Sequence, residues 1–212
     1  ESTSGASTSD ENTSDENTSA ENTSDASMSR ADLQNTGVYP DGGPSTFNEL
    51  VWKFQTDKPV ITSPVVSAGT VYIGSFDSHL YAVDTASGQE QWSFKTDSGI
   101  RSSPAISGGT VYFGSNDGHL YAVDTASGQE QWSFKTDDGI GSSPAISGGT
   151  VYFGSNDGHL YAVDTASGQE QWSFKTDDGI GSSPAISGGT VYFGSNDGHL
   201  YAVDTASGQE QW

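Results

Sequence analysis

The sequence predicts an all-β fold made of tandem, four-stranded antiparallel units. Leu, Ile and Met are scarce, whereas Gly, Ser, Thr, Val and Tyr are plentiful, which favours short strands joined by tight turns. Glycine-containing turns separate short apolar segments in the same order along most of the chain. The period of this pattern is marked by five tryptophans spaced 40 residues apart: Trp52, Trp92, Trp132, Trp172 and Trp212.

The repeat is nearly exact toward the C-terminus. Residues 132–171 and 172–211 are identical, and residues 92–131 differ from them only at Ser98 and Arg101, while residues 52–91 diverge most. Repeats of this length are typical of solenoids, propellers and arrays. Identical units present identical side chains, whereas an active site usually combines unlike groups from different segments. The sequence therefore says more about architecture than about activity.

The unit 102–136 shows the predicted strands in order. Two-residue and three-residue turns at Gly108-Gly109 and Asn116-Asp117-Gly118 are hairpin signals, and Thr125–Gln129 is a polar turn. Loops this short join antiparallel neighbours, so each unit is expected to form a meander. The expected strands are 102–107, 110–115, 119–124 and 131–136.

Both faces of each sheet are predicted to be covered by neighbouring units. Val111 and Phe113 alternate with Tyr112 in the second strand, so both alternating sets are apolar. A sheet that is apolar on both faces needs cover on both faces. The first strand carries Pro104 or its equivalent, which suits a sheet edge because proline cannot donate to a strand ladder. Four-stranded sheets stacked about an axis, with one edge strand at the centre, describe a β-propeller.

One motif recurs in every unit: Ala122-Val123-Asp124 is followed by Gly128 and Trp132. It is similar to the docking motif of the PQQ-type (quinoprotein-like) β-propellers, with Ser127 where that family has Thr. The resemblance spans about residues 30–212 and implies that each tryptophan packs between adjacent blades, near a motif alanine and glycine. The implied docking residues are Ala82, Asp84, Gly88, Trp92, Ala122, Asp124, Gly128, Trp132, Ala162, Asp164, Gly168, Trp172, Ala202, Asp204, Gly208 and Trp212.

The net charge of −21 restricts the classes of partner. Residues 1–50 carry ten acids against Arg30, and residues 51–212 carry eighteen acids against six basic side chains. Such a surface repels phosphate, so nucleic acid and anionic lipid are not expected partners. The balance resembles that of proteins from high-salt environments, where about 1 M salt shortens the screening length to about 3 Å; an ordinary acidic protein is the alternative. Cysteine is absent, and no apolar run predicts membrane insertion.

Residues 1–28 are predicted to be a disordered acidic tail. Their pentapeptide repeats lack the apolar side chains needed to offset chain entropy. They contain three N-x-S/T sequons, which indicate a glycosylated stalk on a secreted protein, unless the sequons are an unmodified by-product of the repeat. Residues 29–50 are expected to be an ordered lead-in, and residues 51–212 the propeller repeats. The possible glycosylation sites are Asn12, Asn17 and Asn22.

The strand predicted at Val51–Thr56 has no three preceding strands of its own. It could complete a blade whose other strands lie at 181–204, either in the same chain or in a second one. The first option gives a four-bladed ring and the second an eight-bladed ring of two chains, whereas a run of chains gives a fibre. Because blades of this family suit wider rings, we expect the two-chain ring, in which Trp52 and Trp212 compete for one position.

No catalytic group is singled out by the sequence. Enzymes of the resembling family bind pyrroloquinoline quinone with calcium and commonly use an adjacent Cys pair, which this chain lacks. One histidine per unit, as at His119, is expected to bond to a turn rather than to share a metal ion. We therefore expect no cofactor and no metal, and a non-catalytic extracellular or cell-surface scaffold with an unidentified protein partner. The alternatives are a structural protein that polymerises by strand exchange and, third, a PQQ-dependent dehydrogenase.

Overall fold

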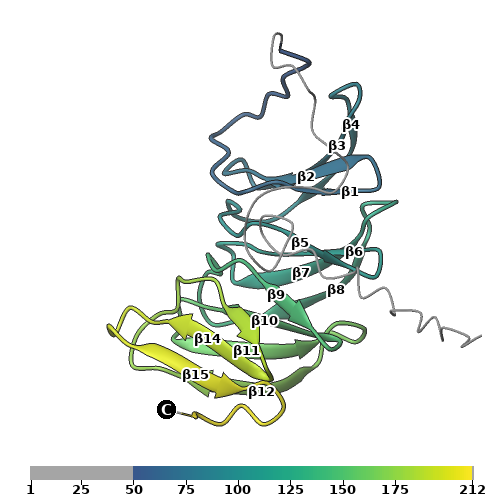
Figure 1. Cartoon of the computed structure of the whole chain (residues 1–212). Helices are drawn as coiled ribbons and strands as arrows, with labels where there is room; N and C mark the ends of the chain where they lie inside the picture. The colour runs from purple at the N-terminus through teal and green to yellow at the C-terminus, as the bar shows by residue number, and fades with distance from the viewer. Residues whose placement is uncertain (1–49, 212) are drawn as a thin grey trace, which may run out of the picture.

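The computed structural model describes residues 50–211, which form strands and loops in an open arc of four sheets (Figure 1). Three sheets have four antiparallel strands and the last has three. Among the described residues no helix is long and apolar enough to cross a membrane. The predicted tail and its three sequons lie outside the described residues, as does the lead-in apart from Leu50.

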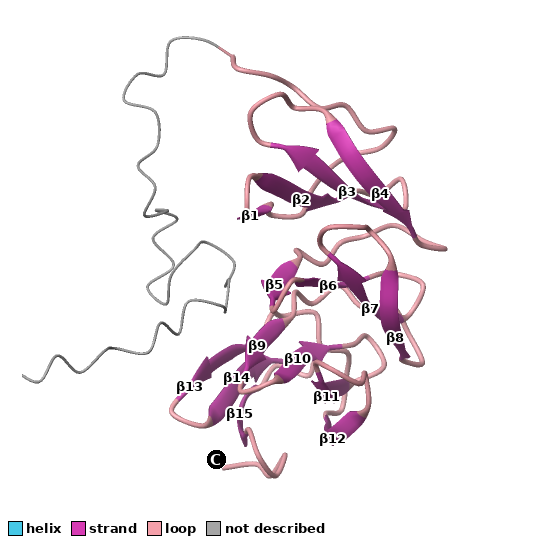
Figure 2. Cartoon of the chain, turned by 90° about the vertical axis from the view of Figure 1, so that its right-hand side faces the viewer, coloured by secondary structure: helices cyan, strands magenta, loops and turns pink. Residues whose placement is uncertain are grey.

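Each sheet is a meander in which chain order equals spatial order. Figure 2 shows the first strand of each sheet on the inner side of the arc and, in the three complete sheets, the fourth strand on the outer side. The first sheet contains β1 (Val65–Ser67), β2 (Thr70–Gly74), β3 (His79–Asp84) and β4 (Glu90–Lys95). The second contains β5 (Ala105–Ser107), β6 (Thr110–Gly114), β7 (His119–Asp124) and β8 (Glu130–Lys135). The third contains β9 (Ala145–Ser147), β10 (Thr150–Gly154), β11 (His159–Asp164) and β12 (Glu170–Lys175), and the last contains β13 (Ala185–Ser187), β14 (Thr190–Gly194) and β15 (Leu200–Asp204).

The predicted strands are confirmed, with differences at their ends. The first strand begins at Ala105 rather than Ser102. In the segment before each proline, one side chain bonds within its own sheet, as when Ser142 Oγ accepts from the Gly154 N–H over 3.1 Å, and the next residue bonds to the neighbouring sheet. The Ser103 backbone N–H donates to Ser143 Oγ over 2.9 Å, and the Ser143 N–H donates to Ser183 Oγ over 3.0 Å. These bonds run from one inner segment to the next along the arc.

The core consists of the seams between successive sheets, as the two apolar faces predict. In one seam, Leu120 and Tyr112 of the second sheet pack against Val151 and Phe153 of the third, and Trp132 and Phe134 line the same cluster. The same cluster recurs at the neighbouring seams. Ile140, which lies on the connection between the two sheets, packs so closely on Gly114 that a side chain there would overlap it. Each sheet is therefore a propeller blade, wedged against its neighbours by repeated contacts.

The two ends of the arc remain open within residues 50–211. Elements of the first and last blades do not contact each other. The prediction of a strand at Val51–Thr56 is wrong for this structure, since no third strand lies beside this segment to pair with it. At the other end, β15 is followed by an isolated bridge between Val203 and Glu210, and the Gln211 N–H donates to the Ala202 carbonyl over 2.8 Å. A ring of four blades closed within the chain is not what the structure shows.

Candidate functional site

The tryptophans join one blade to the next. Trp92 lies in β4, the last strand of the first blade, and its indole Nε1 donates to the Thr125 carbonyl of the second blade over 3.0 Å. Its ring covers Gly128, where an added Cβ would lie 2.7 Å from the indole. The backbone φ of Gly128 is +69°, a conformation that favours glycine because other residues are strained there. The glycine thus gives both the turn and the space that the indole needs.

The docking motif is therefore shared between consecutive units. Trp132 stacks on Gly168, not on Gly128 of its own motif, and Trp172 stacks on Gly208 in the same way. Within its own blade Trp132 faces Ala122 across the strand pair, and Ala122 is fully buried. Trp52 was absent from the predicted motif set, yet it donates to Thr85 over 2.9 Å and covers Gly88. The 40-residue spacing of the tryptophans is the sequence signal that includes Trp52 among the docking residues. Trp212 lies outside the described residues.

The motif aspartates shape the turn that receives each indole. Asp124 Oδ1 accepts hydrogen bonds from the Ser127 hydroxyl at 2.6 Å, the Ser127 N–H at 2.8 Å and the Ala126 N–H at 3.2 Å. These bonds favour the ionised carboxylate, and they lower the pKa of Asp124 below its ordinary value. The same contacts occur at the other three motif aspartates, Asp84, Asp164 and Asp204.

A second set of aspartates forms inter-blade junctions that sequence reasoning described only as hairpin turns. The Asp117 carboxylate accepts from the Tyr121 hydroxyl at 3.0 Å, from the His119 N–H at 3.0 Å and from the Asp97 N–H at 3.0 Å. Asp97 follows the last strand of the preceding blade, so the carboxylate connects two blades. Burial, followed by the neighbouring Asp117 charge, raises the pKa of Tyr121 well above its ordinary value.

Each histidine of the repeat lies beside the junction aspartate of its own turn. His119 Nδ1 lies 3.3 Å from Asp117 Oδ1, and the equivalent pairs recur in all four blades. Among residues 50–211, no three His or acidic side chains converge closely enough to hold a metal ion. Each polar junction group is instead used in contacts between strands and blades.

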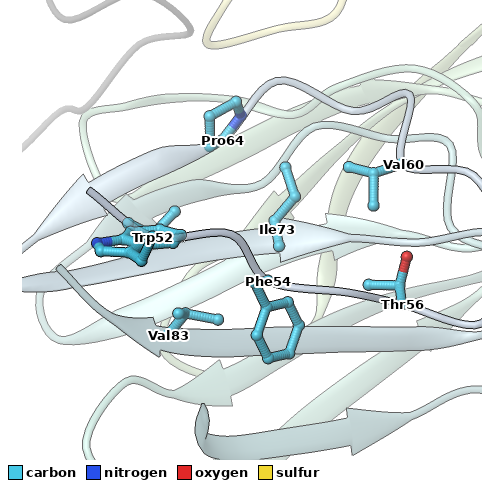
Figure 3. Close-up of a pocket in the computed structure, with 8 residues that line it drawn as sticks. Trp52, Phe54, Thr56, Val60, Pro64, Ile73 and Val83 are labelled. Atoms are coloured by element: carbon cyan, nitrogen blue, oxygen red, sulfur yellow. The ribbon is translucent and has the colours of Figure 1, made fainter. Parts of the chain in front are cut away.

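An apolar pocket of about 260 Å³ opens on the first blade (Figure 3). In the interior blades the corresponding surface at Val111 and Phe113 is fully buried by the preceding blade. On the first blade, among residues 50–211, the segment from Trp52 to Val60 lies over this face and leaves the pocket open. Its lining residues are Trp52, Phe54, Thr56, Val60, Pro64, Val71, Ile73 and Val83.

The sheets, seams and repeated docking motif define a PQQ-type β-propeller repeat protein. A family model described as outer membrane protein assembly factor BamB matches residues 46–212, and the chain belongs to this family. No curated protein sequence matches the chain.

Solved structures show the same fold at low sequence identity. BamB from Moraxella catarrhalis is 23% identical with a TM-score of 0.69, and the match covers 77% of this chain and 55% of that one. The computationally designed protein Ika4 is 20% identical with a TM-score of 0.67, over 75% of this chain and 99% of that one. The quinohemoprotein alcohol dehydrogenase ADHIIG from Pseudomonas putida HK5 is 22% identical with a TM-score of 0.65, over 76% and 34% respectively. The chain thus spans about half of the BamB structure and a third of the dehydrogenase.

Proposed function

We propose that the protein is a non-catalytic scaffold that binds a protein partner through the repeated faces of its blades. The observation that carries this proposal is the fourfold repetition of one exposed turn, Thr85–Gln89 and its equivalents, held rigidly by the motif aspartate. Identical rigid turns on successive blades give a partner several equal contact points, and linked contacts raise the overall affinity. The family match, described as an assembly factor, supports a role in protein interaction.

Charge defines the kind of partner. The repeats carry eighteen acids against six bases, and the outer strands expose residues such as Glu90 and Glu130. An acidic surface attracts basic surfaces and increases their rate of encounter. The partner that fits is thus a protein with a basic face, on or outside the cell, where the predicted glycosylated stalk would hold the propeller away from the surface.

The test compares two triple variants with the same change of charge. Ala86→Arg, Ala126→Arg and Ala166→Arg alter the exposed turn in three blades, whereas Ser93→Arg, Ser133→Arg and Ser173→Arg alter the exposed outer strand. Each protein is added to intact source cells and cross-linked, and the recovered surface proteins are quantified by mass spectrometry. We expect the turn variant to lose a specific partner that the wild type and the strand variant retain. Equal recovery of that partner by all three would contradict binding through the turns.

The non-catalytic part of the proposal has a separate assay. The Asp117 carboxylate, like its equivalents, already accepts hydrogen bonds from a tyrosine and from the preceding blade, which does not favour a role as a base in substrate oxidation. Incubation with pyrroloquinoline quinone and Ca²⁺, followed by a dye-reduction assay with alcohols, should give no turnover. Turnover that depends on the quinone would make the third alternative, a dehydrogenase, the better description.

We also propose that two copies pair to complete the ring. The supporting observation is that the first and last blades each leave an apolar face uncovered within the described residues, and that the two blades do not meet. Light scattering in molar salt tests this: the mass should reach a plateau at twice that of the chain. Continued growth with concentration would favour the alternative, a polymer formed through the same open ends.

A further inference from the structure

We infer that Asp138 and Asp178 are sites of spontaneous isomerisation to isoaspartate, and that the fold protects the other Asp-Gly pairs of residues 50–211. The inference is independent of the proposed binding function. An aspartate isomerises most readily before glycine, because a glycine has no Cβ to hinder attack by its backbone nitrogen. Five aspartates in this range precede a glycine: Asp117, Asp138, Asp157, Asp178 and Asp197. The structure divides these five into two groups.

The first group lies on the connections between blades. The Gly139 N–H donates to Asp138 Oδ1 over 2.6 Å, and the Gly179 N–H donates to Asp178 Oδ1 over 2.6 Å. Each contact holds the backbone nitrogen beside the carboxyl carbon to which that oxygen is bonded. Two groups held this close react as an intramolecular pair, which raises the rate of reaction between them. Both aspartates are exposed, so water reaches their carboxyl groups.

The reaction needs no co-reactant other than water. The Gly139 nitrogen attacks Cγ of the protonated Asp138 carboxyl group and forms a C–N bond. The hydroxyl of that group and the amide hydrogen leave together as water, and the product is a cyclic succinimide. Water then adds to one of the two ring carbonyl carbons and breaks its bond to nitrogen. Opening at Cγ restores aspartate, whereas opening at the former backbone carbonyl leaves the chain running through Cβ and Cγ. The net change is an isomerisation that adds one carbon to the backbone, without oxidation or reduction.

The second group lies in the hairpin turns within blades, where both reacting groups have other partners. The Gly118 N–H donates to the Ser115 carbonyl over 3.2 Å. The Asp117 carboxylate accepts from the His119 N–H and the Tyr121 hydroxyl, each at 3.0 Å, and its side chain is only 7% exposed. The nitrogen and the carboxyl group are therefore held apart from each other and from water. The same contacts occur at Asp157 and Asp197.

The repeat itself contains a variant of the reactive position. The connection between the first and second blades has Ser98 where the next connection has Asp138. The Ser98 carbonyl accepts from the Thr96 and Ser115 hydroxyls over 2.6 and 3.1 Å. The Asp138 carbonyl makes the same two contacts, at 2.7 and 3.3 Å. The connection thus follows its path without an aspartate, and Asp138→Ser should preserve the fold.

Isomerisation at Asp138 would loosen the seam between the second and third blades. The Ile140 N–H donates to the Ser115 carbonyl of the second blade over 2.9 Å. The Gly139 carbonyl accepts from the Asn156 N–H of the third blade over 3.1 Å. Ile140 is also fully buried in this seam. An additional backbone carbon next to these residues displaces them, so we expect the aged protein to be less stable than the fresh protein.

The test locates isoaspartate in the folded and in the unfolded chain. Protein in molar salt, with its fold checked by circular dichroism, and protein in guanidinium chloride are incubated at neutral pH. Each is then digested with trypsin, and isoaspartate is assigned by electron-transfer fragmentation. Trypsin separates the identical units, because it yields residues 102–135, 136–175 and 176–212 as different peptides.

In the folded protein we expect isoaspartate to form at Asp138 and Asp178 at least about 10-fold faster than at Asp117 and Asp157. In the unfolded protein all of these positions should react at similar rates. Equal rates in the folded protein would overturn the inference. So would a folded protein that forms no isoaspartate at Asp138 while the unfolded protein does.

Two double variants with the same change of charge test the effect on the seam. Asp138→Ser with Asp178→Ser removes the reactive pairs, whereas Asp137→Ser with Asp177→Ser changes the exposed neighbours and keeps them. During incubation the urea midpoint should fall in the wild type and in the second variant, and stay constant in the first. A fall of the same size in all three would overturn the link between isomerisation and the seam.

Discussion

The contact between the turn glycine and the indole gives a sharp test of how the blades hold together. Gly128 supports the indole of Trp92, and an added methyl group would lie 2.7 Å from that ring. Gly108, in the hairpin turn of the same blade, has a similar backbone conformation but nothing within 4 Å of an added methyl group. The backbone φ angles are +69° and +57°. The pair therefore separates backbone strain from loss of indole packing.

The expected magnitudes follow from these two surroundings. Alanine in a left-handed conformation costs about 1–2 kcal/mol, and this cost applies to both Gly128→Ala and Gly108→Ala. Overpacking against a ring that cannot move freely costs about 1–3 kcal/mol more, and only Gly128→Ala has it. We expect Gly128→Ala to reduce the free energy of unfolding by about 2–5 kcal/mol and Gly108→Ala by about 1–2 kcal/mol.

Urea denaturation in molar salt, followed by tryptophan fluorescence, measures both values, because a change at the Trp92 seam alters the emission of that indole. If the two variants lose the same stability, the glycine serves the turn alone and the indole does not depend on the space above it. If Gly128→Ala loses less than Gly108→Ala, the packing argument is wrong.

Three further predictions concern pH and salt. Burial, followed by the hydrogen bond to Asp77, raises the pKa of Tyr81 from 10.0 to about 12, so the folded state favours the protonated phenol. The stability that this group contributes is present below pH 10 and is lost as the pH rises toward 12. The thermal unfolding midpoint should therefore fall over this pH range in the wild type and fall less in Tyr81→Phe. Hydrogen bonds from Ser127 lower the pKa of Asp124 below its ordinary value of 3.8. The stability that this carboxylate contributes is thus present above pH 3.8 and is lost as the pH falls through the lowered pKa. Asp124→Asn should therefore reduce the fall of the thermal unfolding midpoint in acid, and an unchanged fall would contradict this role. The net charge of −21 predicts loss of strand signal in circular dichroism when molar salt is diluted, and full structure in dilute buffer would refute the high-salt interpretation.

Much of the architecture could be predicted because the same pattern of strands and turns recurs in every unit. The 40-residue period, the paired apolar faces and the recurring proline together predict four-stranded blades. The strand at His119–Asp124 agrees with the prediction to the residue, as do its equivalents in the first and third blades, whereas the equivalent strand of the last blade begins at Leu200. The polar turn expected at Thr125–Gln129 is present, and Asp124 caps its backbone, as aspartate commonly does before a turn. These features depend on local periodicity and turn chemistry, which a single sequence records directly.

Other features depended on which surfaces meet in space. The sequence places Gly128 four residues before Trp132, yet the indole over Gly128 is that of Trp92, since the blades stack in chain order and the ring reaches forward across the seam. The role of Asp117 in joining two blades was hidden for the same reason, because its partner Asp97 belongs to the preceding unit. The segment 51–56 has the sequence pattern of a fourth strand, but among residues 50–211 no strand pairs with it. Sequence by itself determined the repeated unit and its turns. The tertiary structure decided which glycine receives each indole and which carboxylate joins two blades, because a seam is formed by two surfaces that lie about one repeat apart in the chain.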